Sequence, residues 1–457
     1  MSKGPVIVVT GANGLLVQLS SPHPSDAQPY FEVAGADAAH HPGVLDGYEF
    51  DVDAGATIIM ACRDPRRAED ARARLYRLLD EHVAALPPGS KEQVYASTFR
   101  KNVRLELEVL DLASMKSVLD FGRRASEKYE YMSHLIFNAG TATYSHLDLI
   151  GFILDFLRFP IHAVQHPRSN IQVNGVLSKD NVGQPRHQPG IQPQYRSLQD
   201  LLVAYTNLTN RSARVLWMSS LDSEPVFDPE DDWQLTKTYY SYQASKYQID
   251  LIASELEKRT IEALETGRPS SMEETVAPHG EIHHLIVSPG IVSTNMSSLL
   301  KIWIPGYRYL VAASFWLVRL FGAPHVLMSV FSAAVSAVHL ALVPLRHVPT
   351  VRNSPQISPL DVEYPFWHPY YGQTSTRVQA LRFGSENDRW GNDRPGVIAV
   401  PVWDEHPNAG EVLLERFERL YQAFYMANAD RDRDEDGHGN GNGNDVGYAK
   451  TEDGSAL

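Results

Sequence analysis

The chain has 457 residues, an apolar fraction of 43% and a formal net charge of −14. This apolar fraction is enough for a large core, and the negative charge excludes a general nucleic-acid binder, which needs clustered Lys and Arg to neutralise phosphates. The single cysteine, Cys62, excludes an internal disulfide framework and a cysteine-based zinc site. The opening residues lack a long apolar run, so we expect no cleaved signal peptide.

Short apolar runs, each ending in a turn signal, predict strands that are buried on both faces of a parallel sheet. Helical patterns lie between these runs at 64–86, 114–129 and 242–264. The alternation predicts an α/β fold with a doubly wound parallel sheet of the Rossmann type. The predicted strands are "VIVVTG" (6–11), "ATIIMACR" (56–63), "RLELEVLDL" (104–112), "HLIFNAG" (134–140), "ARVLWMSS" (213–220) and "IHHLIVSPG" (282–290).

We expect one extended domain over residues 1–426. Within it, 19–55 is rich in Pro, His, Asp and Gly and reads as an irregular insertion, whereas 297–345 is the least polar part and reads as a helical lid region. Residues 427–457 are acidic and rich in Gly and Asn, which predicts a disordered tail.

Tyr242 and Lys246 are four residues apart on a predicted helix, so their side chains share one face. A phenol has a pKa of about 10, and a nearby ammonium lowers it toward the range in which tyrosine exchanges protons. Among Tyr239, Tyr240 and Tyr242, only Tyr242 has a lysine four residues later. Such a pair also occurs by chance on helix surfaces.

Two hydroxyl groups end the buried strand that precedes this helix. Ser219 and Ser220 follow "ARVLWM", and a side chain at the carboxyl end of a parallel strand can reach a ligand bound there. The serines, the Tyr-x-x-x-Lys pair and the later "SPGIVST" occur in the order that is typical of short-chain dehydrogenases/reductases, a family that the chain resembles.

This resemblance implies roles for particular residues. Ser220, with Ser219 as the alternative, positions the substrate carbonyl, Tyr242 transfers the proton, and Lys246 lowers the tyrosine pKa and binds the nicotinamide ribose. Asn138 of "FNAG" stabilises the central sheet beside the adenosine ribose, and Asp111 lies near the adenine ring. The remaining implied cofactor contacts are Thr10, Gly11 and Asn13 in the first loop and Thr294 in "PGIVST".

The end of the second strand bears on the cofactor. In a dinucleotide fold an acid there binds the ribose 2′-OH, whereas arginine accommodates a 2′-phosphate. Arg63 stands at this point, followed by Arg66 and Arg67, which favours NADPH over NADH. The alternative is that these arginines form a solvated helix face. Asp64 is predicted to be the helix N-cap.

A narrower resemblance rests on "WMSS", the long acidic segment after it and "YQASKYQIDL". These stretches resemble the 3-keto-steroid reductases of sterol biosynthesis, especially the fungal ergosterol branch. The resemblance implies NADPH-dependent reduction of a 3-keto sterol to the 3β-alcohol, at the cytosolic face of the endoplasmic reticulum or on lipid droplets. It also implies contact with other enzymes of sterol C4 demethylation.

The apolar region admits two interpretations. Segment 303–325 is either a peripheral membrane attachment or a buried lid, because charged residues interrupt it before the roughly 20 apolar residues of a spanning helix are reached. Segment 326–344 is predicted to be a core helix in which His339 is a packing residue rather than a ligand.

Two segments depart from the family pattern. Leu15 and Val17 occupy the positions of two loop glycines, and proline-rich sequence replaces the helix that should receive the phosphates. Near 184–197, "PRHQPGIQPQYRSLQ" replaces the helix that carries the family asparagine, and neither Asn174 nor Asn181 has the matching context. We therefore predict weak NADPH affinity for the sequence as written.

Two explanations account for these departures. The chain is either a diverged sterol-binding or scaffolding pseudoenzyme, or residues 15–56 and 184–197 are gene-model errors in an intact reductase. The abrupt change of composition at the boundaries favours the second explanation. A reductase of another lipid carbonyl, such as a retinoid, is a further alternative.

Overall fold

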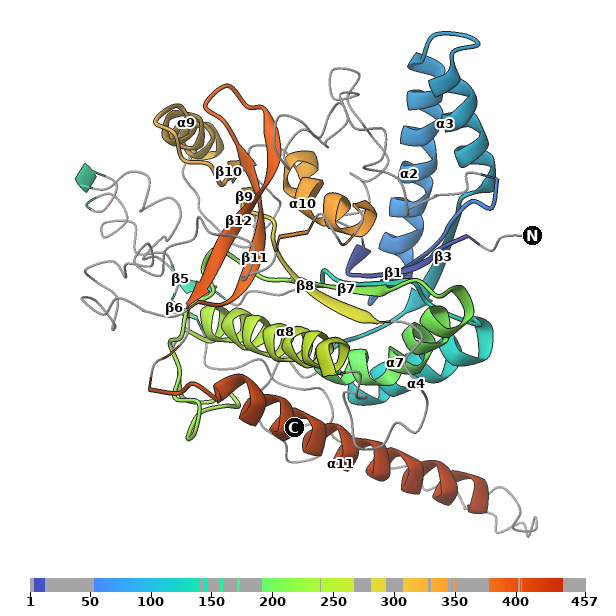
Figure 1. The fold of residues 1–457 in the computed structure, drawn as a ribbon, viewed down its shortest axis with the longest axis vertical. Helices are drawn as coiled ribbons and strands as arrows, with labels where there is room; N and C mark the ends of the chain where they lie inside the picture. Colours follow the sequence, from blue (N-terminus) through green and yellow to red (C-terminus); the bar gives the residue numbers. More distant parts are fainter. Residues whose placement is uncertain are drawn as a thin grey trace, which may run out of the picture.

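The sheet is mostly parallel and lies at the centre of the molecule (Figure 1). The computed structural model describes residues 4–12, 53–139, 144–146, 154, 157–158, 171–172, 191–238, 240–266, 281–292, 307–327, 330–343, 345, 348–349, 378–401, 403 and 405–438. In this part of the chain the main sheet has eight strands in the order β12-β11-β8-β7-β4-β1-β2-β3, of which only β11 and β12 are antiparallel to each other. The strands are β1 (Val6–Thr10), β2 (Thr57–Cys62), β3 (Arg104–Val109), β4 (His134–Phe137), β7 (Ala213–Met218), β8 (Ile282–Ser288), β11 (Val378–Asn387) and β12 (Asp393–Pro401).

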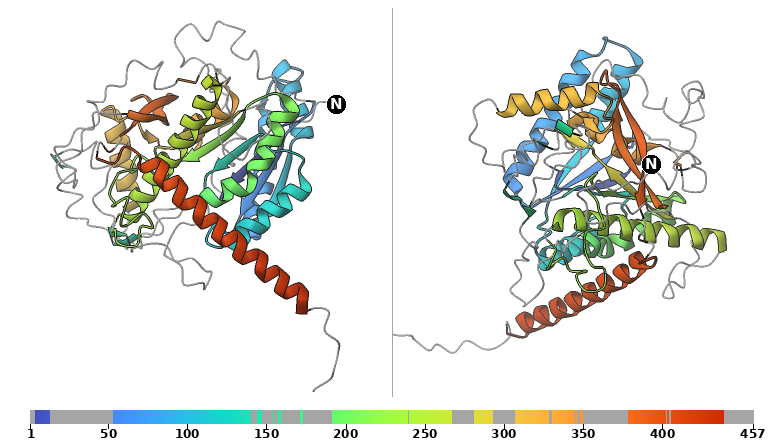
Figure 2. Two further views of the ribbon diagram at one scale, coloured as in Figure 1. Left: turned by 60° about the horizontal axis from the view of Figure 1, so that its bottom comes forward. Right: turned by 90° about the vertical axis from the view of Figure 1, so that its left-hand side faces the viewer.

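Helices cover both faces of this sheet (Figures 1 and 2). One face carries α2 (Pro65–Ala85) and α10 (Val330–Leu342), and α3 (Lys91–Asn102) packs on α2. The opposite face carries α4 (Met115–Lys128), α7 (Ile191–Thr209) and α8 (Ser241–Thr266). The long helix α11 (Ala409–His438) lies outside them, against α8, α7 and α4. The predicted doubly wound α/β fold is confirmed.

The core is divided by the sheet. Strand β7 is buried at all six positions, which is the environment that its unbroken apolar sequence predicts. Alternate residues of each strand contribute to the two sides, because successive side chains point to opposite faces. Thus Trp217 packs with Phe137 under α4, α7 and α8, whereas Met218 and Ile136 pack under α2 and α10.

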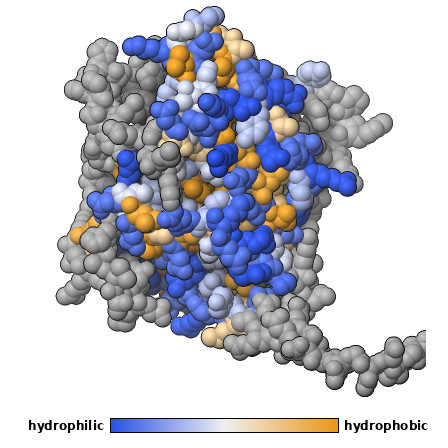
Figure 3. Space-filling model, turned by 90° about the vertical axis from the view of Figure 1, so that its right-hand side faces the viewer, coloured by the Kyte–Doolittle hydropathy of each residue, from blue (hydrophilic) through white to orange (hydrophobic). Residues whose placement is uncertain are grey.

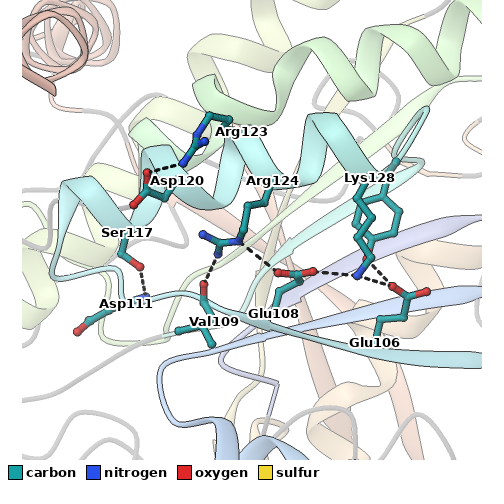
Figure 4. A network of polar contacts seen from close by, with 10 residues as sticks. Glu106, Glu108, Val109, Asp111, Ser117, Asp120, Arg123, Arg124 and Lys128 are labelled. Carbon is teal, nitrogen blue, oxygen red and sulfur yellow. Dashed lines mark hydrogen bonds and ion pairs between the residues drawn. The ribbon is translucent and has the colours of Figure 1, made fainter. Parts of the chain in front are cut away.

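The edge strand β3 carries charges that face α4 (Figure 4). Lys128 Nζ lies 2.9 Å from Glu106 and 3.0 Å from Glu108, and Arg124 Nη2 donates to the Val109 carbonyl at 2.9 Å. Charged side chains on an edge strand discourage pairing with another chain. The surface on this side is mainly hydrophilic with scattered apolar side chains (Figure 3).

The core-helix prediction for 326–344 is confirmed for Val330–Leu342, which form α10, whereas Val326–Leu327 form a short strand. Buried groups of the sheet satisfy its last carbonyls: Arg214 donates to Leu340, and His134 Nε2 lies 2.9 Å from the Ala341 carbonyl oxygen. Burial, with Arg214 nearby, lowers the pKa of His134 to about 3, so this imidazole stays neutral. Burial also lowers the pKa of His339 to about 4, as expected for a packing residue.

The rest of the apolar region forms α9 (Tyr307–Leu320) and the short strand β10 (Val326–Leu327), which pairs with β9 (Ile291–Val292). None of the helices within the described ranges is both long enough and apolar enough to cross a membrane. A small antiparallel pair, β5 (Tyr144–His146) with β6 (Ile171–Gln172), completes the described strands.

The predicted start of the tail at 427 is wrong: α11 continues to His438, because extending a helix that is already anchored adds hydrogen bonds without a new nucleation cost. Helix α7 begins at Ile191, inside the segment 184–197 that departs from the family pattern, and accommodates Pro193 in its first turn, where a missing N–H removes no helical bond. The insertion at 19–55 lies outside the described residues, apart from its last three positions.

Candidate active site

The predicted site residues that the structure describes gather along the carboxyl edge of the parallel sheet. Strands β1, β2, β3, β4 and β7 end immediately before Gly11, Arg63, Leu110, Asn138 and Ser219, respectively. Helix α8 begins at Ser241 and brings Tyr242 to the same edge as the serines. In open α/β sheets, ligands bind in the crevice outside this edge.

The turn after β1 is closely fitted to β4. Gly11 has a φ of +60°, and a Cβ at this position would lie 2.8 Å from Ala139 Cα, so a side chain is excluded there. Asn138 Nδ2 donates to the carbonyls of Thr10 and Gly11 at 3.2 and 3.0 Å. The Ala139 N–H donates to Thr10 Oγ1 at 3.0 Å. Thr10, Gly11 and Asn138 therefore hold two neighbouring strand ends together.

The end of β2 leads directly into α2. The Asp64 side chain accepts from the backbone N–H groups of Arg66 and Arg67 at 3.0 and 3.3 Å, so the predicted N-cap is confirmed. The same carboxylate lies 3.5 Å from Arg67 Nε. Arg63 is exposed at the strand end, where it is available to a ligand at this edge.

Asp111 lies in the turn between β3 and α4. Its backbone N–H donates to Ser117 Oγ at 3.0 Å (Figure 4), and its carboxylate accepts from the Ala113 N–H at 3.1 Å. These bonds fix the turn and leave Asp111 partly exposed. Its assignment near an adenine ring stays a prediction.

Tyr242 and Lys246 are brought together as their spacing predicts. Lys246 Nζ lies 5.9 Å from the centroid of the Tyr242 ring and donates to the Met218 carbonyl at 2.7 Å. The lysine is buried, and this burial lowers its pKa to about 8, with the nearby Asp250 carboxylate opposing the shift. One hydrogen bond thus fixes the lysine to the last residue of β7, beside the two serines.

The structure distinguishes the two serines. Ser219 is only 3% exposed, whereas Ser220 is partly exposed at the edge of the sheet. Ser220 Oγ accepts from the Asp222 N–H at 3.2 Å. Because a hydroxyl can donate one bond while accepting others, Ser220 can still donate to a ligand. Ser220 is therefore better placed than Ser219 for the expected role.

Sequence reasoning did not find the groups that lie beneath this site. Asp250, two helical turns after Tyr242, is fully buried and accepts from Ser223 Oγ. Arg382, from the unpredicted strand β11, lies 3.3 Å from the same carboxylate and donates to the Ser220 carbonyl at 2.6 Å. The sequence carries two signals for Asp250: it continues the i, i+4 series of Tyr242 and Lys246, and it belongs to the stretch "YQASKYQIDL".

The acidic segment between β7 and α8 is folded. Arg416 of α11 donates to the carbonyls of Pro229 and Glu230 at 2.8 and 3.2 Å, and its guanidinium lies 5.7 Å from the Trp233 ring centroid. The buried Asp232 carboxylate accepts from the backbone N–H groups of Thr236, Lys237 and Thr238. The chain segment that leads into α8 and Tyr242 is thus held in place by its own hydrogen bonds and by α11.

Asn13 and Thr294 lie outside the described residues, as do Leu15 and Val17. Their expected contacts with a cofactor, and the predicted weak NADPH affinity, stay predictions.

Comparison with known proteins identifies the relatives of the chain. A 3-keto-steroid reductase of Debaryomyces hansenii is 29% identical over 241 residues, which are 52% of this chain and 63% of that protein. The 3-keto-steroid reductase erg27 of Aspergillus fumigatus is 24% identical over 378 residues, 79% of this chain and 77% of that protein. The chain is thus similar in sequence to the fungal 3-keto-steroid reductases.

This relationship is distant. The match to the Saccharomyces cerevisiae 3-keto-steroid reductase ERG27 reaches 32% identity but covers only 40% of that protein. The chain thus spans less than two thirds of the length of several of these relatives. No family model matches the sequence.

Solved structures resemble the chain at lower sequence identity than these reductases do. The Pseudomonas aeruginosa RhlG/NADP active-site complex has 16% identity and a TM-score of 0.40, and covers 76% of this chain and 92% of that one. The L-sorbose reductase of Gluconobacter frateurii, complexed with NADPH and L-sorbose, has 13% identity and a TM-score of 0.33, and covers 68% and 80%.

The described residues fit a dinucleotide at the carboxyl edge. The left-handed turn at Gly11 removes side-chain bulk at the end of β1, Arg63 presents a cation at the end of β2, and the ammonium of Lys246 lies at the end of β7. These three points span the edge along which a nucleotide lies in such folds.

Proposed function

We propose that the chain is an NADPH-dependent reductase that converts a 3-keto sterol to the 3β-hydroxy sterol. The observation that carries the proposal is the fixed position of Lys246 between Tyr242 and the Met218 carbonyl. The 3-keto-steroid reductases among its relatives support the choice of substrate.

In this proposal the substrate carbonyl lies between Ser220 and Tyr242. Ser220 donates a hydrogen bond to the carbonyl oxygen, which fixes the ketone and polarises it. Tyr242 then transfers its phenolic proton to that oxygen as negative charge develops there. The ammonium of Lys246 stabilises the tyrosinate that remains, because an adjacent positive charge favours the ionised phenol.

NADPH, when bound, supplies the hydride that becomes the new C–H bond at C3. Lys246 would hold the nicotinamide ribose, Asn138 and Gly11 would shape the adenosine side of the edge, and Arg63 would face the 2′-phosphate. The hydride and the tyrosine proton together convert the ketone to the alcohol.

The direct test is an assay of the full chain with NADPH and a 4-demethylated 3-keto sterol, in parallel with retinal as the alternative carbonyl. We expect sterol-dependent NADPH oxidation and a 3β-alcohol product, identified by mass spectrometry against authentic standards. Expression in cells that lack sterol 3-keto reduction should restore their sterol product.

Turnover of retinal but not of the keto sterol would contradict the proposed substrate and indicate a reductase of another lipid carbonyl. Absence of both activities, together with absence of NADPH binding by calorimetry, would favour the pseudoenzyme. Sequencing the transcript across codons 14–57 and 183–200 separates that outcome from an error in the gene model.

We further propose that the protein attaches peripherally to a membrane through α9. Five large apolar side chains on or just after this helix are exposed, and Tyr309, Trp316 and Phe321 are exposed by 83%, 51% and 61%. Tyr309, Trp316, Leu317 and Leu320 recur at helical spacing, so α9 presents an apolar stripe to solvent.

The tip of the β11–β12 hairpin lies beside this stripe. The Asn387 N–H donates to the Pro324 carbonyl at 2.7 Å, and Trp390 at the tip is 79% exposed. Aromatic side chains of this kind favour the interface between lipid and water. The endoplasmic reticulum and the lipid droplet are the two surfaces that we propose.

Replacing Trp316, Phe321 and Trp390 together with serine should lower binding to phosphatidylcholine vesicles about tenfold or more, because three aromatic anchors are lost. Flotation assays with vesicles, and with triglyceride droplets coated by the same lipid, measure the loss and compare the two surfaces. The matched control is Val94→Ser/Tyr95→Ser on α3, where two side chains are also exposed. Equal binding by the triple variant and the wild type would refute attachment through this surface.

Association with other enzymes of sterol C4 demethylation stays a proposal. Co-purification from detergent-solubilised membranes tests it.

A further inference from the structure

A buried ion pair lies directly beneath the proposed catalytic groups. Asp250 has no exposed surface and Arg382 is 4% exposed, and their charged atoms are 3.3 Å apart. Taking two charges out of water is costly, and replacing such pairs with apolar residues is often neutral or stabilising. The cost of burying this pair makes a role other than stability worth testing.

Arg382 connects β11 to the turn that carries Ser220. Its Nη1 donates both to the Ser220 carbonyl, at 2.6 Å, and to Asp250 Oδ2, at 3.3 Å. The Ser223 N–H donates to the same Ser220 carbonyl at 3.2 Å, and Ser223 Oγ donates to Asp250 Oδ2. The turn is therefore attached to the ion pair at both of its ends, and the position of Ser220 depends on it.

Asp250 also acts on the lysine of the site. It lies four residues after Lys246 on the same helix face, and its negative charge favours the protonated lysine against the effect of burial. Arg382 cannot lose its proton, so the carboxylate form of Asp250 is the one that compensates it. Burial raises the pKa of Asp250, and the groups around the carboxylate that oppose this shift are Arg382, the hydroxyls of Ser219 and Ser223, and Lys246. The groups that face Lys246 are Tyr242, Asp250 and the Met218 carbonyl.

We propose that Asp250 and Arg382 are positioning residues for the reaction: the pair holds the Ser220 turn in place, and the Asp250 carboxylate keeps Lys246 in its charged form. This inference rests on the proposed function for its catalytic consequence. The effect on Lys246 is independent of which reaction the protein performs.

Four variants separate positioning from stability. Asp250→Asn removes the negative charge, and Arg382→Lys keeps the positive charge but loses the planar fork. Asp250→Asn/Arg382→Met removes both charges, so neither remains buried alone. Arg394→Met is the matched control, because it breaks the ion pair between Arg394 and Glu386 in the same hairpin without reaching Ser220.

Three measurements are made on each variant. Thermal unfolding reports stability, and steady-state kinetics with NADPH and 3-keto sterol report kcat and KM. Trace acetylation of Lys246 between pH 6 and 11, quantified by mass spectrometry, reports the lysine pKa in the protein without substrate or cofactor. This last readout does not require an active enzyme.

We expect Asp250→Asn to lower the Lys246 pKa below about 8. Arg382→Lys and the double variant should stay folded and lose about tenfold to a hundredfold in kcat, because a displaced serine no longer meets the carbonyl. In these variants the KM for NADPH should remain close to the wild-type value. In the control Arg394→Met, both kcat and KM should remain close to their wild-type values.

An unchanged Lys246 pKa in both Asp250 variants would overturn the electrostatic part of the inference. Wild-type kcat in the folded Arg382→Lys and double variants would overturn the positioning part. A wild-type protein without reductase activity would contradict the proposed function instead, and the Lys246 titration would still decide the effect of Asp250. Should Asp250→Asn fail to fold, Arg382→Lys retains both charges, and its kcat decides the positioning role.

Discussion

Replacing Tyr242 with phenylalanine should lower kcat for 3-keto sterol reduction by about a thousandfold. The substitution removes one oxygen atom, and with it the proposed proton donor, at a position whose ring is held beside Lys246. Loss of a positioned general acid costs about 10²–10⁴ in rate. The measurement is single-turnover reduction with saturating NADPH, together with thermal unfolding to show that the fold is retained.

Tyr240→Phe is the matched control. Tyr240 precedes the same helix but is 45% exposed and has no lysine four residues later, so its loss should leave turnover near the wild-type value. A Tyr242→Phe protein that keeps more than a tenth of the wild-type rate would exclude Tyr242 as the proton donor. Complementation of sterol 3-keto reduction by this variant would favour a scaffolding role.

The second large effect is expected from pH. Burial lowers the pKa of Lys246 from its usual value to about 8, and Asp250 limits the change. Because the charged lysine is the form that assists Tyr242, kcat/KM should be level at neutral pH and fall as the pH rises through about 8. Well above that pH the loss approaches about tenfold for each pH unit, as for any single titration.

The same pKa shift affects stability in the opposite direction: activity falls as the pH rises, whereas the free energy of unfolding increases. The folded-state pKa of Lys246 lies below its unfolded value of 10.5. The unfolded chain therefore binds this proton more tightly, and the penalty for a buried ammonium disappears as the pH rises from about 8 to 10.5. Loss of activity above pH 8 should thus occur without unfolding caused by this group.

Initial rates between pH 6 and 10, with circular dichroism at each pH, test this expectation. In Lys246→Met the activity should be low and without the step near pH 8. Lys258→Met, on the same helix but with a 57% exposed lysine side chain, should retain the wild-type profile. A wild-type profile that is flat to pH 10 would show that the charge of Lys246 is not needed.

The parallel part of the sheet could be predicted because its strands are buried on both faces. Continuous apolar runs such as "ARVLWM" distinguish these strands from the helices around them, and β7 is indeed buried throughout. The β11–β12 hairpin lacks this signal. Arg382 and Glu386 stand among its alternating residues, and the burial of Arg382 depends on Asp250, which is distant in sequence.

The site shows the same division between local and distant determinants. Tyr242 and Lys246 are related by one helical turn, so the sequence alone is sufficient to bring them together. The difference between Ser219 and Ser220 could not be read from their identical side chains. It arises from the direction of the turn, which Arg382 and Ser223 set through the Ser220 carbonyl and Asp250.

The order in which the chain is synthesised has a consequence for the buried ion pair. Arg382 follows Asp250 by 132 residues, which corresponds to roughly 7 to 26 seconds of translation at about 5–20 residues per second. During that interval a nascent chain already holds Ser220, Tyr242 and Lys246, but lacks the cation that compensates Asp250 and the strand that fixes the serine turn. Arg416, which binds the chain segment that precedes α8, emerges later still. The proposed catalytic edge is therefore completed by segments that leave the ribosome after its catalytic residues, and a chain that stops before β11 contains these residues without a finished site.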